Sequence, residues 1–257
     1  MHEHDFTCNI CGSRQRAGIE MFNRETPSCR KCDSTVRYRS LIHNLSLALF
    51  QTSIVLPEFP TRREIKGVGM SDWDGFAPLL AKKLDYTRTY FDREPRLDIK
   101  NLTDTQRGRY DFVLCSEVLE HVAPPVEQAV TGLFDLLKPG GVLLLTVPCQ
   151  INEKTIEHFP NLYEYSVTRL GESYVLVNRT KAGTYEVFDE LRFHGGIGAT
   201  LEMRIFGDLD LPGTLAAAGF EQFTVLGEDY PQYGIIFREH WSLPMSARKR
   251  AGAVARK

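Results

Sequence analysis

Four of the six cysteines stand in two pairs near the start of the chain. Cys8 and Cys11 form one Cys-x2-Cys pair, Cys29 and Cys32 form another, and seventeen residues lie between the pairs. Two such turns present the four thiolates that a tetrahedral zinc ion prefers in a reducing compartment. All four ligand positions would be cysteine, which leaves no open coordination position, so we predict a structural zinc with no role in catalysis. Two disulfides are one alternative, disfavoured because the N-terminal sequence does not resemble a secretory signal. A redox Cys-x-x-Cys is the other, disfavoured because it would not need a second pair.

Imidazole and carboxylate groups form a second set of candidates. Glu117, Glu120 and His121 are spaced i, i+3 and i+4 after Ser116, which predicts one face of a helix near its amino terminus. His194 lies beside two glycines in a long late segment. Imidazole titrates near neutrality, so His194 is the leading candidate for a general base. The alternative is a loop histidine that binds backbone carbonyls.

A strand, a helix and a second strand are expected around these groups. Residues 111–115 and 142–147 are short apolar runs typical of buried strands, and helical spacing of apolar residues lies between them. A βαβ unit implies parallel strands with a right-handed crossover. Ligands bind beyond the carboxyl ends of such strands, where Ser116 and Glu117 are expected to face the ligand.

Residues 109–122 (RYDFVLCSEVLEHV) and 137–148 (LKPGGVLLLTVP) resemble the fourth-strand and fifth-strand motifs of class I S-adenosylmethionine-dependent methyltransferases. The resemblance is nearest to the branch with ubiquinone-type O-methyltransferases. It covers roughly residues 64–237 and is specific in the central forty. It implies an α/β fold, a seven-stranded doubly wound (Rossmann-like) sheet, and S-adenosylmethionine as cofactor.

The resemblance leaves several readings of the Glu117 segment open. Some ubiquinone-type relatives bind a divalent cation through Glu-x-x-Glu-His, here Glu117, Glu120 and His121. Alternatively, Glu117 lies near the methionine part of the cofactor and His121 is a second base candidate. A third reading is carboxylates favoured by the dipole of a helix start.

The first strand, residues 63–69, and the loop after it should approach the cofactor closely. Gly67 and Gly69 allow that approach, although Ser71 stands where the family usually has a third glycine. Lys66 stands where an acidic residue is often found. Ser71 or Asp72 is expected to hold the methionine amino group, with a helix cap as the alternative.

Acidic residues after the second strand, residues 86–91, should bind the nucleoside. Asp92 follows Gly69 by 23 residues and is expected to accept hydrogen bonds from the ribose hydroxyls, with Glu94 as a near competitor. Asp98 resembles the family's acidic position near the adenine amino group. A pair between Asp98 and Arg96 is the alternative.

The chain is expected to contain a small module and one large domain. Residues 1–50 form the zinc ribbon and a helix, 51–62 a linker, 63–245 the methyltransferase domain and 246–257 a frayed basic tail. An insertion at 149–210 is predicted to form a lid, with a hairpin around residues 181–183. The last two strands are expected to start at Phe223 and at Gly234.

Composition sets wide limits on partners. The 257 residues are 42% hydrophobic and 25% charged, with a net charge of −2, so nucleic acid or an anionic membrane would need a local basic patch. No apolar stretch reaches membrane-span length, and a cytoplasmic protein is expected. Basic residues do gather in the ribbon, and the two interpretations of them are a phosphate-binding face and a solvated face. They are Arg14, Arg16, Arg24, Arg30, Lys31, Arg37 and Arg39.

Combined with the near-neutral chain and the long insertion, the resemblance implies methyl transfer to a small polar or saccharide-like acceptor, with O-, N- and C-methylation all open. A substrate-covering ribbon is at least as favoured as one that binds nucleic acid. RNA methylation guided by the ribbon is one alternative. A scaffold that binds the cofactor without catalysis is the other, because of the departures in the glycine loop.

Overall fold

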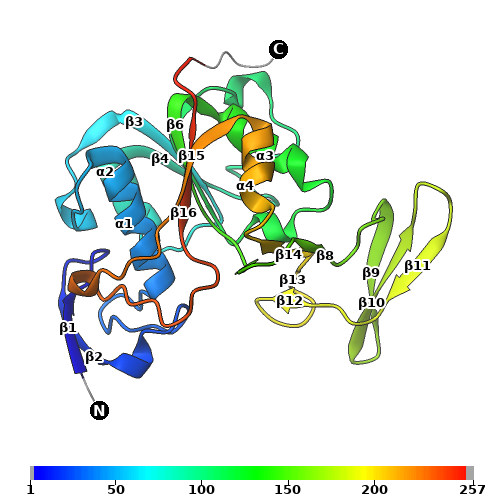
Figure 1. Ribbon diagram of the computed structural model, residues 1–257, viewed down its shortest axis with the longest axis horizontal. Coiled ribbons are helices and arrows are strands. Elements are labelled where there is room, and N and C mark those ends of the chain that lie inside the picture. The colour runs from blue at the N-terminus through cyan, green and yellow to red at the C-terminus, as the bar shows by residue number, and fades with distance from the viewer. Residues whose placement is uncertain (1–2, 253–257) are drawn as a thin grey trace.

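A central sheet of six strands organises the chain in the computed structural model, which describes residues 3–252 (Figure 1). The strand order is β15-β16-β6-β5-β3-β4. β3, β4, β5 and β6 are parallel, and β16 is antiparallel to both of its neighbours. The strands are β3 (Arg62–Met70), β4 (Leu84–Thr89), β5 (Tyr110–Ser116), β6 (Leu137–Thr146), β15 (Phe220–Val225) and β16 (Met245–Lys249).

Helices cover both faces of this sheet. α1 (Val36–Phe50) and α2 (Ala77–Lys83) pack on one face, while α3 (Val126–Leu136) and α4 (Leu211–Ala218) pack on the other (Figure 1). Alternate residues of β5 serve the two faces, since Phe112 and Leu114 belong to the core under α1 whereas Val113 and Cys115 belong to the core under α3. The doubly wound α/β arrangement predicted from the sequence is therefore confirmed.

The sheet has six strands in the described residues where seven were predicted. The chain between β4 and β5 forms loops and a short 3-10 helix, η3 (Asp104–Gln106), so no strand lies beyond β4. The strand expected at Gly234 is also wrong. That segment follows η5 (Pro231–Tyr233) as a loop, and β16 takes the place in the sheet between β6 and β15.

The frayed basic tail predicted from residue 246 is wrong as far as Lys249. Met245 and Ala247 are buried between neighbouring strands, and Lys249 is only 2% exposed. Its ammonium donates to the backbone carbonyl of Phe134 at 3.0 Å and lies 4.3 Å from the centre of that ring. The aliphatic stem of lysine packs as apolar surface, so a basic residue completes a strand. Residues 253–257 of the predicted tail lie outside the described part.

The ribbon shares its core with the sheet. It consists of β1 (Glu3–Thr7), β2 (Arg14–Gly18) and the 3-10 helix η1 (Ile19–Met21), and a second short turn, η2 (Leu56–Glu58), follows α1. Phe6 and Ile10 belong to the same buried cluster as Leu41 of α1 and Phe112 of β5. Residues 51–62 therefore connect two parts of one core, and the linker predicted there does not separate independent cores.

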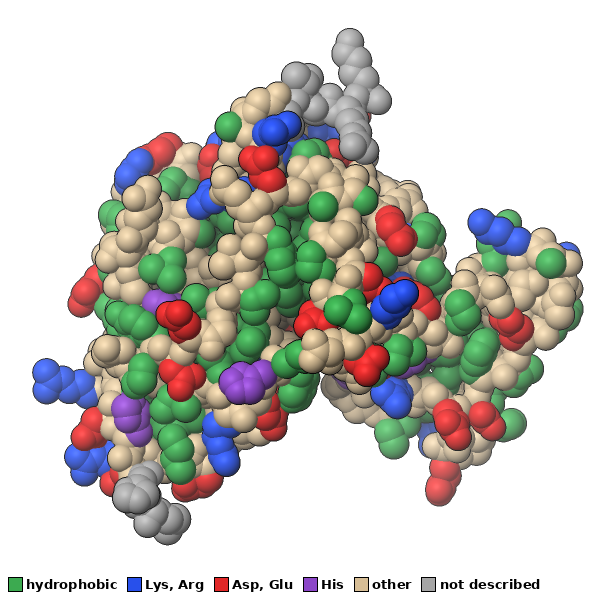
Figure 2. Space-filling model, in the orientation of Figure 1, with side chains coloured by type: hydrophobic (Ala, Val, Ile, Leu, Met, Phe, Trp, Pro, Cys, Tyr) green, Lys and Arg blue, Asp and Glu red, His purple; other side chains and the backbone are tan. Residues whose placement is uncertain are grey.

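The insertion after β6 forms its own small layer. Strands β9, β10 and β11 make an antiparallel sheet that extends away from the main body (Figures 1 and 2). The predicted hairpin is present, because β10 pairs with β11 around residues 181–183. The strands of the insertion are β7 (Cys149–Gln150), β8 (Ile156–Glu157), β9 (Glu164–Leu170), β10 (Ser173–Arg179), β11 (Tyr185–Phe188), β12 (Phe193–His194), β13 (Thr200–Leu201) and β14 (Arg204–Gly207).

Among residues 3–252, every helix is too short or too polar to span a lipid bilayer.

Candidate active site

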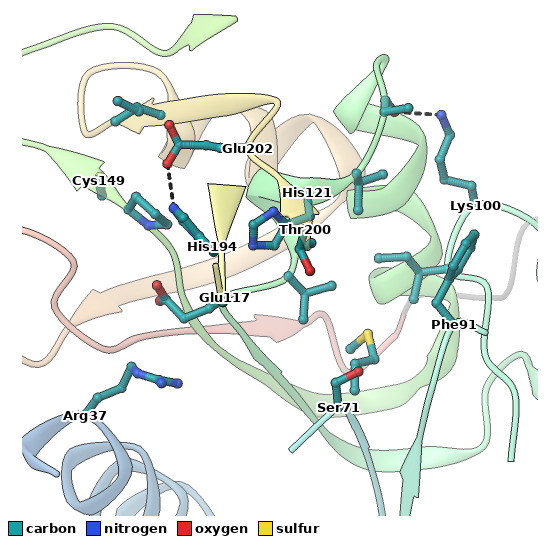
Figure 3. Close-up of a pocket in the computed structure, with 18 of the residues that line it drawn as sticks. Arg37, Ser71, Phe91, Lys100, Glu117, His121, Cys149, His194, Thr200 and Glu202 are labelled. Atoms are coloured by element: carbon teal, nitrogen blue, oxygen red, sulfur yellow. Dashed lines mark hydrogen bonds and ion pairs between the residues drawn. The ribbon is translucent and has the colours of Figure 1, made fainter. Parts of the chain in front are cut away.

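A cavity of about 1760 Å³ lies at the carboxyl ends of β3 and β5. Its sheet side carries Ser71 and Glu117, and its insertion side carries His194 and Glu202 (Figure 3). Arg37, from the first turn of α1, points toward Glu117 from a third side (Figure 3). The cavity is therefore bounded by three segments that lie far apart in the sequence.

The two predicted glycines do not line this cavity. Gly67 and Gly69 both lie within β3, so the expected glycine turn is wrong. A Cβ on Gly67 would clash with the ring of Phe112, and a Cβ on Gly69 would clash with Asp72 and Tyr86. The glycines are needed for close packing behind the strand, which is a different reason from contact with a ligand.

The turn after β3 separates Ser71 from Asp72. Ser71 has a left-handed φ of 53° and lines the cavity. Asp72 is buried behind the strand, outside the cavity lining, and accepts a hydrogen bond from the hydroxyl of Tyr86. Burial raises the pKa of Asp72 to about 7. Ser71 is thus placed to meet a ligand, and the predicted ligand contact of Asp72 is not supported.

The predicted nucleoside-binding acids lie at the cavity edge. Asp92 and Asp98 both line it, beside the apolar side chains of Leu97 and Ile99. Asp98 accepts hydrogen bonds from the backbone N–H of Lys100 at 3.0 Å and from Asn101 at 2.9 Å. Arg96 instead donates to the backbone carbonyl of Phe91, and Glu94 binds the Arg96 N–H outside the cavity. The geometry therefore gives less support to Glu94 as the ribose ligand and to a pair between Asp98 and Arg96.

The helix predicted to open at Ser116 is absent. Glu117 has a left-handed φ of 54°, and the chain continues as the short 3-10 helix η4 (Leu119–His121) before α3 starts at Val126. Glu117, Glu120 and His121 therefore do not share a helix face. Glu117 and His121 line the cavity, whereas Glu120 is fully buried. Ser116 lies just behind the lining, where its hydroxyl contacts Thr146 at 2.8 Å.

Both predicted base candidates meet in the cavity. The rings of His121 and His194 lie 4.8 Å apart at nearly a right angle (Figure 3). Nδ1 of His121 donates to the carbonyl of Leu201 at 2.8 Å, so Nε2 of its neutral ring is left as an acceptor. Burial lowers the pKa of His121.

Glu202 is the residue of this cluster that the sequence did not indicate. Its buried carboxylate lies 2.8 Å from Nε2 of His194 and 2.8 Å from Nε2 of His158. Because Nε2 of His194 donates to the carboxylate of Glu202, Nδ1 of that ring is left as an acceptor. The pairing arises because β12 and β13 form a hairpin, and no spacing in the sequence signals it.

A group of possible metal ligands lies at the same place. One ligand atom each of Glu120, His121 and His194 falls within 4.8 Å of the others. Neither carboxylate oxygen of Glu120 has a hydrogen-bond partner among the described residues. Burial, reinforced by the charge of Glu117, raises the pKa of Glu120 to about 9.

The four N-terminal cysteines come together as predicted. The sulfur of Cys8 lies 3.7 Å from that of Cys32, and the sulfur of Cys11 lies 3.7 Å from that of Cys29. Cys29 and Cys32 are 3.5 Å apart. Four sulfurs at about 2.3 Å from one zinc ion would stand about 3.8 Å from each other. The cluster therefore has the dimensions of a tetrahedral zinc site.

Comparisons with known proteins agree with this geometry. A family model described as "Methyltransferase domain" matches residues 47–178. The ubiquinone biosynthesis O-methyltransferase of Psychrobacter cryohalolentis is 36% identical over 84 residues, which are 33% of this chain and 28% of that protein. The enzyme of the same name from Acinetobacter baumannii (strain AYE) is 29% identical over 142 residues, 54% of this chain and 53% of that protein.

A solved structure shows the same fold. The CurJ carbon methyltransferase superimposes with a TM-score of 0.50 at 13% identity, over 85% of this chain and 56% of that one. The chain spans between about a quarter and about half of the length of the two curated relatives. The matched family model, the strand order and the position of the cavity confirm the predicted class I fold, and the chain belongs to the methyltransferase domain family.

Proposed function

We propose that this chain transfers a methyl group from S-adenosylmethionine to a small polar or saccharide-like acceptor. The observation that supports this most is the two-sided cavity, with acidic residues at the sheet ends and with His194 of the insertion facing His121. Its volume of about 1760 Å³ exceeds the roughly 300–1,000 Å³ of a usual ligand pocket, which gives room for a donor and an acceptor together.

The sheet side fits the donor. Asp92 is placed to accept hydrogen bonds from the ribose hydroxyls, and Asp98 to face the adenine edge between Leu97 and Ile99. Ser71, Ser116 and Glu117 lie at the methionine end, with Ser116 behind the lining. S-adenosylmethionine, when bound, supplies a methyl group on a positively charged sulfur, so the protein mainly has to align the acceptor.

The insertion side fits the acceptor. His194 is the proposed general base, with Nδ1 free because Nε2 donates to Glu202. Glu202 fixes the tautomer and the ring orientation, as a carboxylate does behind a catalytic imidazole. His121 offers a second acceptor nitrogen nearby. Hydroxyl, amine and carbon acceptors all lose a proton on methylation, and this pair of histidines can receive it.

A divalent cation held by Glu120, His121 and His194 is a second candidate for the same cluster. The unpartnered buried carboxylate of Glu120 favours it. In this proposal His194 takes the place of Glu117 of the predicted set, because Glu117 is paired with Arg24. Calorimetry with Mg²⁺ and Mn²⁺ on the wild type and on Glu120→Gln decides this: heat of binding that the substitution removes supports the cation, and no heat in the wild type rejects it.

We also propose that Cys8, Cys11, Cys29 and Cys32 hold structural zinc. The sulfur separations support this assignment. A zinc site made of four cysteine thiolates fits a reducing compartment such as the cytoplasm. RNA methylation is less favoured, since Arg24, Arg37 and Arg39 of the basic set turn inward into hydrogen bonds.

Calorimetry tests the donor, and a panel of acceptors tests the reaction. S-adenosylmethionine and S-adenosylhomocysteine should each bind at one site per chain. Incubation with catechols, amino sugars and structured RNA, followed by mass spectrometry, should show one added methyl group on a small-molecule acceptor. Methylated RNA alone would favour the ribbon-guided alternative, and donor binding without any product would favour the scaffold. If neither nucleoside binds, the proposed function is wrong.

A further inference from the structure

The loop between the two cysteine pairs contributes to the wall of the cavity. Arg24 lies in this loop, and its Nη2 is 2.5 Å from Oε1 of Glu117, 93 residues later in the chain. Nη1 lies 3.4 Å from the other carboxylate oxygen. The two side chains are only 12% and 20% exposed, so this ion pair is well shielded from solvent. The zinc ribbon therefore reaches the segment that follows β5.

Glu117 needs such support. Its φ of 54° is left-handed, a conformation that residues with a side chain adopt at an energetic cost and keep where their surroundings impose it. Two contacts impose it here. The backbone N–H of Glu117 donates to the carbonyl of Thr146 at 2.9 Å, and the carboxylate is held by Arg24. Without Arg24, only the backbone contact holds this turn at the cavity edge.

Arg24 is itself held in place. Its Nε donates to the carbonyl of Ser242 at 3.2 Å, and its backbone carbonyl accepts the N–H of Arg37 at 3.2 Å. Arg37 donates to Glu25 of the same loop at 2.7 and 2.9 Å and to the hydroxyl of Ser116 at 2.9 Å. Ser116 and Glu117 at the end of β5 are thus held by side chains of α1 and of the ribbon loop. Figure 3 shows Arg37 on this side of Glu117.

We propose that Arg24 is a positioning residue for the methyl donor, and that donor binding therefore requires the folded ribbon. This inference rests on the proposed function, because Glu117 is assigned to the methionine end of the donor. Arg24 lies between Cys11 and Cys29, so closure of the cysteine cluster fixes the ends of its loop. The ribbon thereby acts on the donor site through Glu117 and has no need of direct contact with the acceptor.

The test compares Arg24→Met with Arg16→Met as a matched control. Arg16 lies in the same ribbon but pairs with Asp5 on the surface, where its side chain is 62% exposed. The probe is S-adenosylhomocysteine, titrated calorimetrically into each protein. Arg24→Met should weaken binding by about tenfold or more, as expected for loss of a shielded hydrogen bond between charged groups, while Arg16→Met should bind as the wild type does.

A double-mutant cycle separates positioning from general damage. Glu117→Gln should weaken binding at least as much as Arg24→Met, because it also alters the group that faces the donor. The double variant Arg24→Met with Glu117→Gln should bind no more weakly than Glu117→Gln alone, because Arg24 acts through Glu117. Independent, additive losses would contradict the inference. Arg24→Lys should recover part of the affinity. In steady-state assays, the KM for S-adenosylmethionine should rise more than kcat falls.

Two outcomes distinguish this inference from the proposed function. If the wild type binds no S-adenosylhomocysteine, the proposed function itself fails. If the wild type binds and Arg24→Met binds equally well, only the positioning role fails. If Arg24→Met does not fold, Arg24→Lys and Glu117→Gln are tested in its place. Wild-type affinity for S-adenosylhomocysteine in both variants would overturn the inference.

Discussion

The two walls of the cavity are built in different ways. On the sheet side, Val68, Val113 and Cys115 are completely buried in a continuous core between strands and helices. On the insertion side, the apolar core is the small cluster around Phe159 and Leu176, and β9 is exposed along its whole length. Polar contacts compensate there. The buried Arg204, for example, donates to Glu157 at 2.6 Å and to the backbone carbonyl of Leu119 at 2.5 Å.

This difference matches the division of labour that we propose. A donor common to a whole family can be bound by a wall whose shape is set by strand packing, which tolerates little variation. An acceptor that differs between enzymes is better served by a wall held by a few polar contacts on loops. Each of the following experiments perturbs one of the two walls and includes a control.

Removal of the zinc that we propose for the ribbon should have the largest effect, and it should act on the sheet side. Phe6 and Phe112 belong to one buried cluster, so opening the cysteine site exposes the core under α1. We expect chelation to lower the free energy of unfolding by at least about 4 kcal/mol, the value for a ligand at a thousand times its Kd. Scanning calorimetry with zinc analysis measures this.

Hydrogen exchange locates the damage from chelation. Protection should fall in α1 and β5 and should change little in β10. Cys149→Ala is a suitable control, since Cys149 lies outside the cysteine cluster and should leave the zinc content unchanged. Equal loss of protection in β10 would show that the two walls are one cooperative unit.

Substitution of His194 should affect turnover and spare the donor. With an acceptor identified from the panel, His194→Gln should lower kcat by about 10²–10⁴-fold, the range for loss of a general base. Its affinity for S-adenosylhomocysteine should stay near that of the wild type. Asp92→Asn should have the opposite effect, because it should weaken the binding of S-adenosylhomocysteine. If His194→Gln weakens the donor as much as Asp92→Asn does, the assignment of one ligand to each wall is wrong.

Crowding of the sheet wall should destabilise the fold. Gly69→Ala places a methyl group against Asp72 and Tyr86, and we expect a loss of about 2 kcal/mol, typical of overpacking in a core. Gly213 lies in α4 with no atom near its added Cβ, so Gly213→Ala should be neutral or slightly stabilising. Urea unfolding of the two variants measures both. A harmless Gly69→Ala would show that β3 can move away from its neighbours.

Asp72 should make stability depend on pH on the same wall. Burial raises its pKa in the folded state to about 7 from 3.8, so the folded protein keeps a proton that the unfolded chain releases. The stability that the neutral Asp72 contributes is then fully present below pH 4 and is lost as pH rises to about 7, by about 1 kcal/mol per pH unit. Asp72→Asn should lack this fall in urea unfolding, while Asp74→Asn, on the surface, should retain it. Identical slopes in all three proteins would contradict the buried assignment.

Local patterns in the sequence were sufficient for the parallel strands at the centre of the sheet and for the cysteine cluster. Apolar runs at 111–115 and 142–147 predicted β5 and β6 because strands buried on both faces require continuous apolar residues. The cysteine spacing predicted the cluster because each pair closes within a few residues. β16 was missed because its five residues, MSARK, include a serine and two adjacent basic residues, a composition that was read as a solvated tail.

The site was harder to predict than the fold. The segment after Ser116 has a helical spacing of acids, yet the left-handed turn at Glu117 and the 3-10 helix η4 place Glu120 inside and Glu117 at the cavity. Tertiary contacts override a weak local pattern there. Tertiary contacts also explain the two glycines of β3, which pack against the side chains of Phe112, Asp72 and Tyr86.

The sequence by itself determined the family, the four-cysteine cluster and the strand ends where a donor can bind, because each depends on residues close together in the chain. Only the tertiary structure decided that Arg24 meets Glu117, that Glu202 holds His194, and that Lys249 completes the sheet. Those pairs depend on how segments far apart in the sequence pack. Packing is set by the whole core, and no local spacing records it.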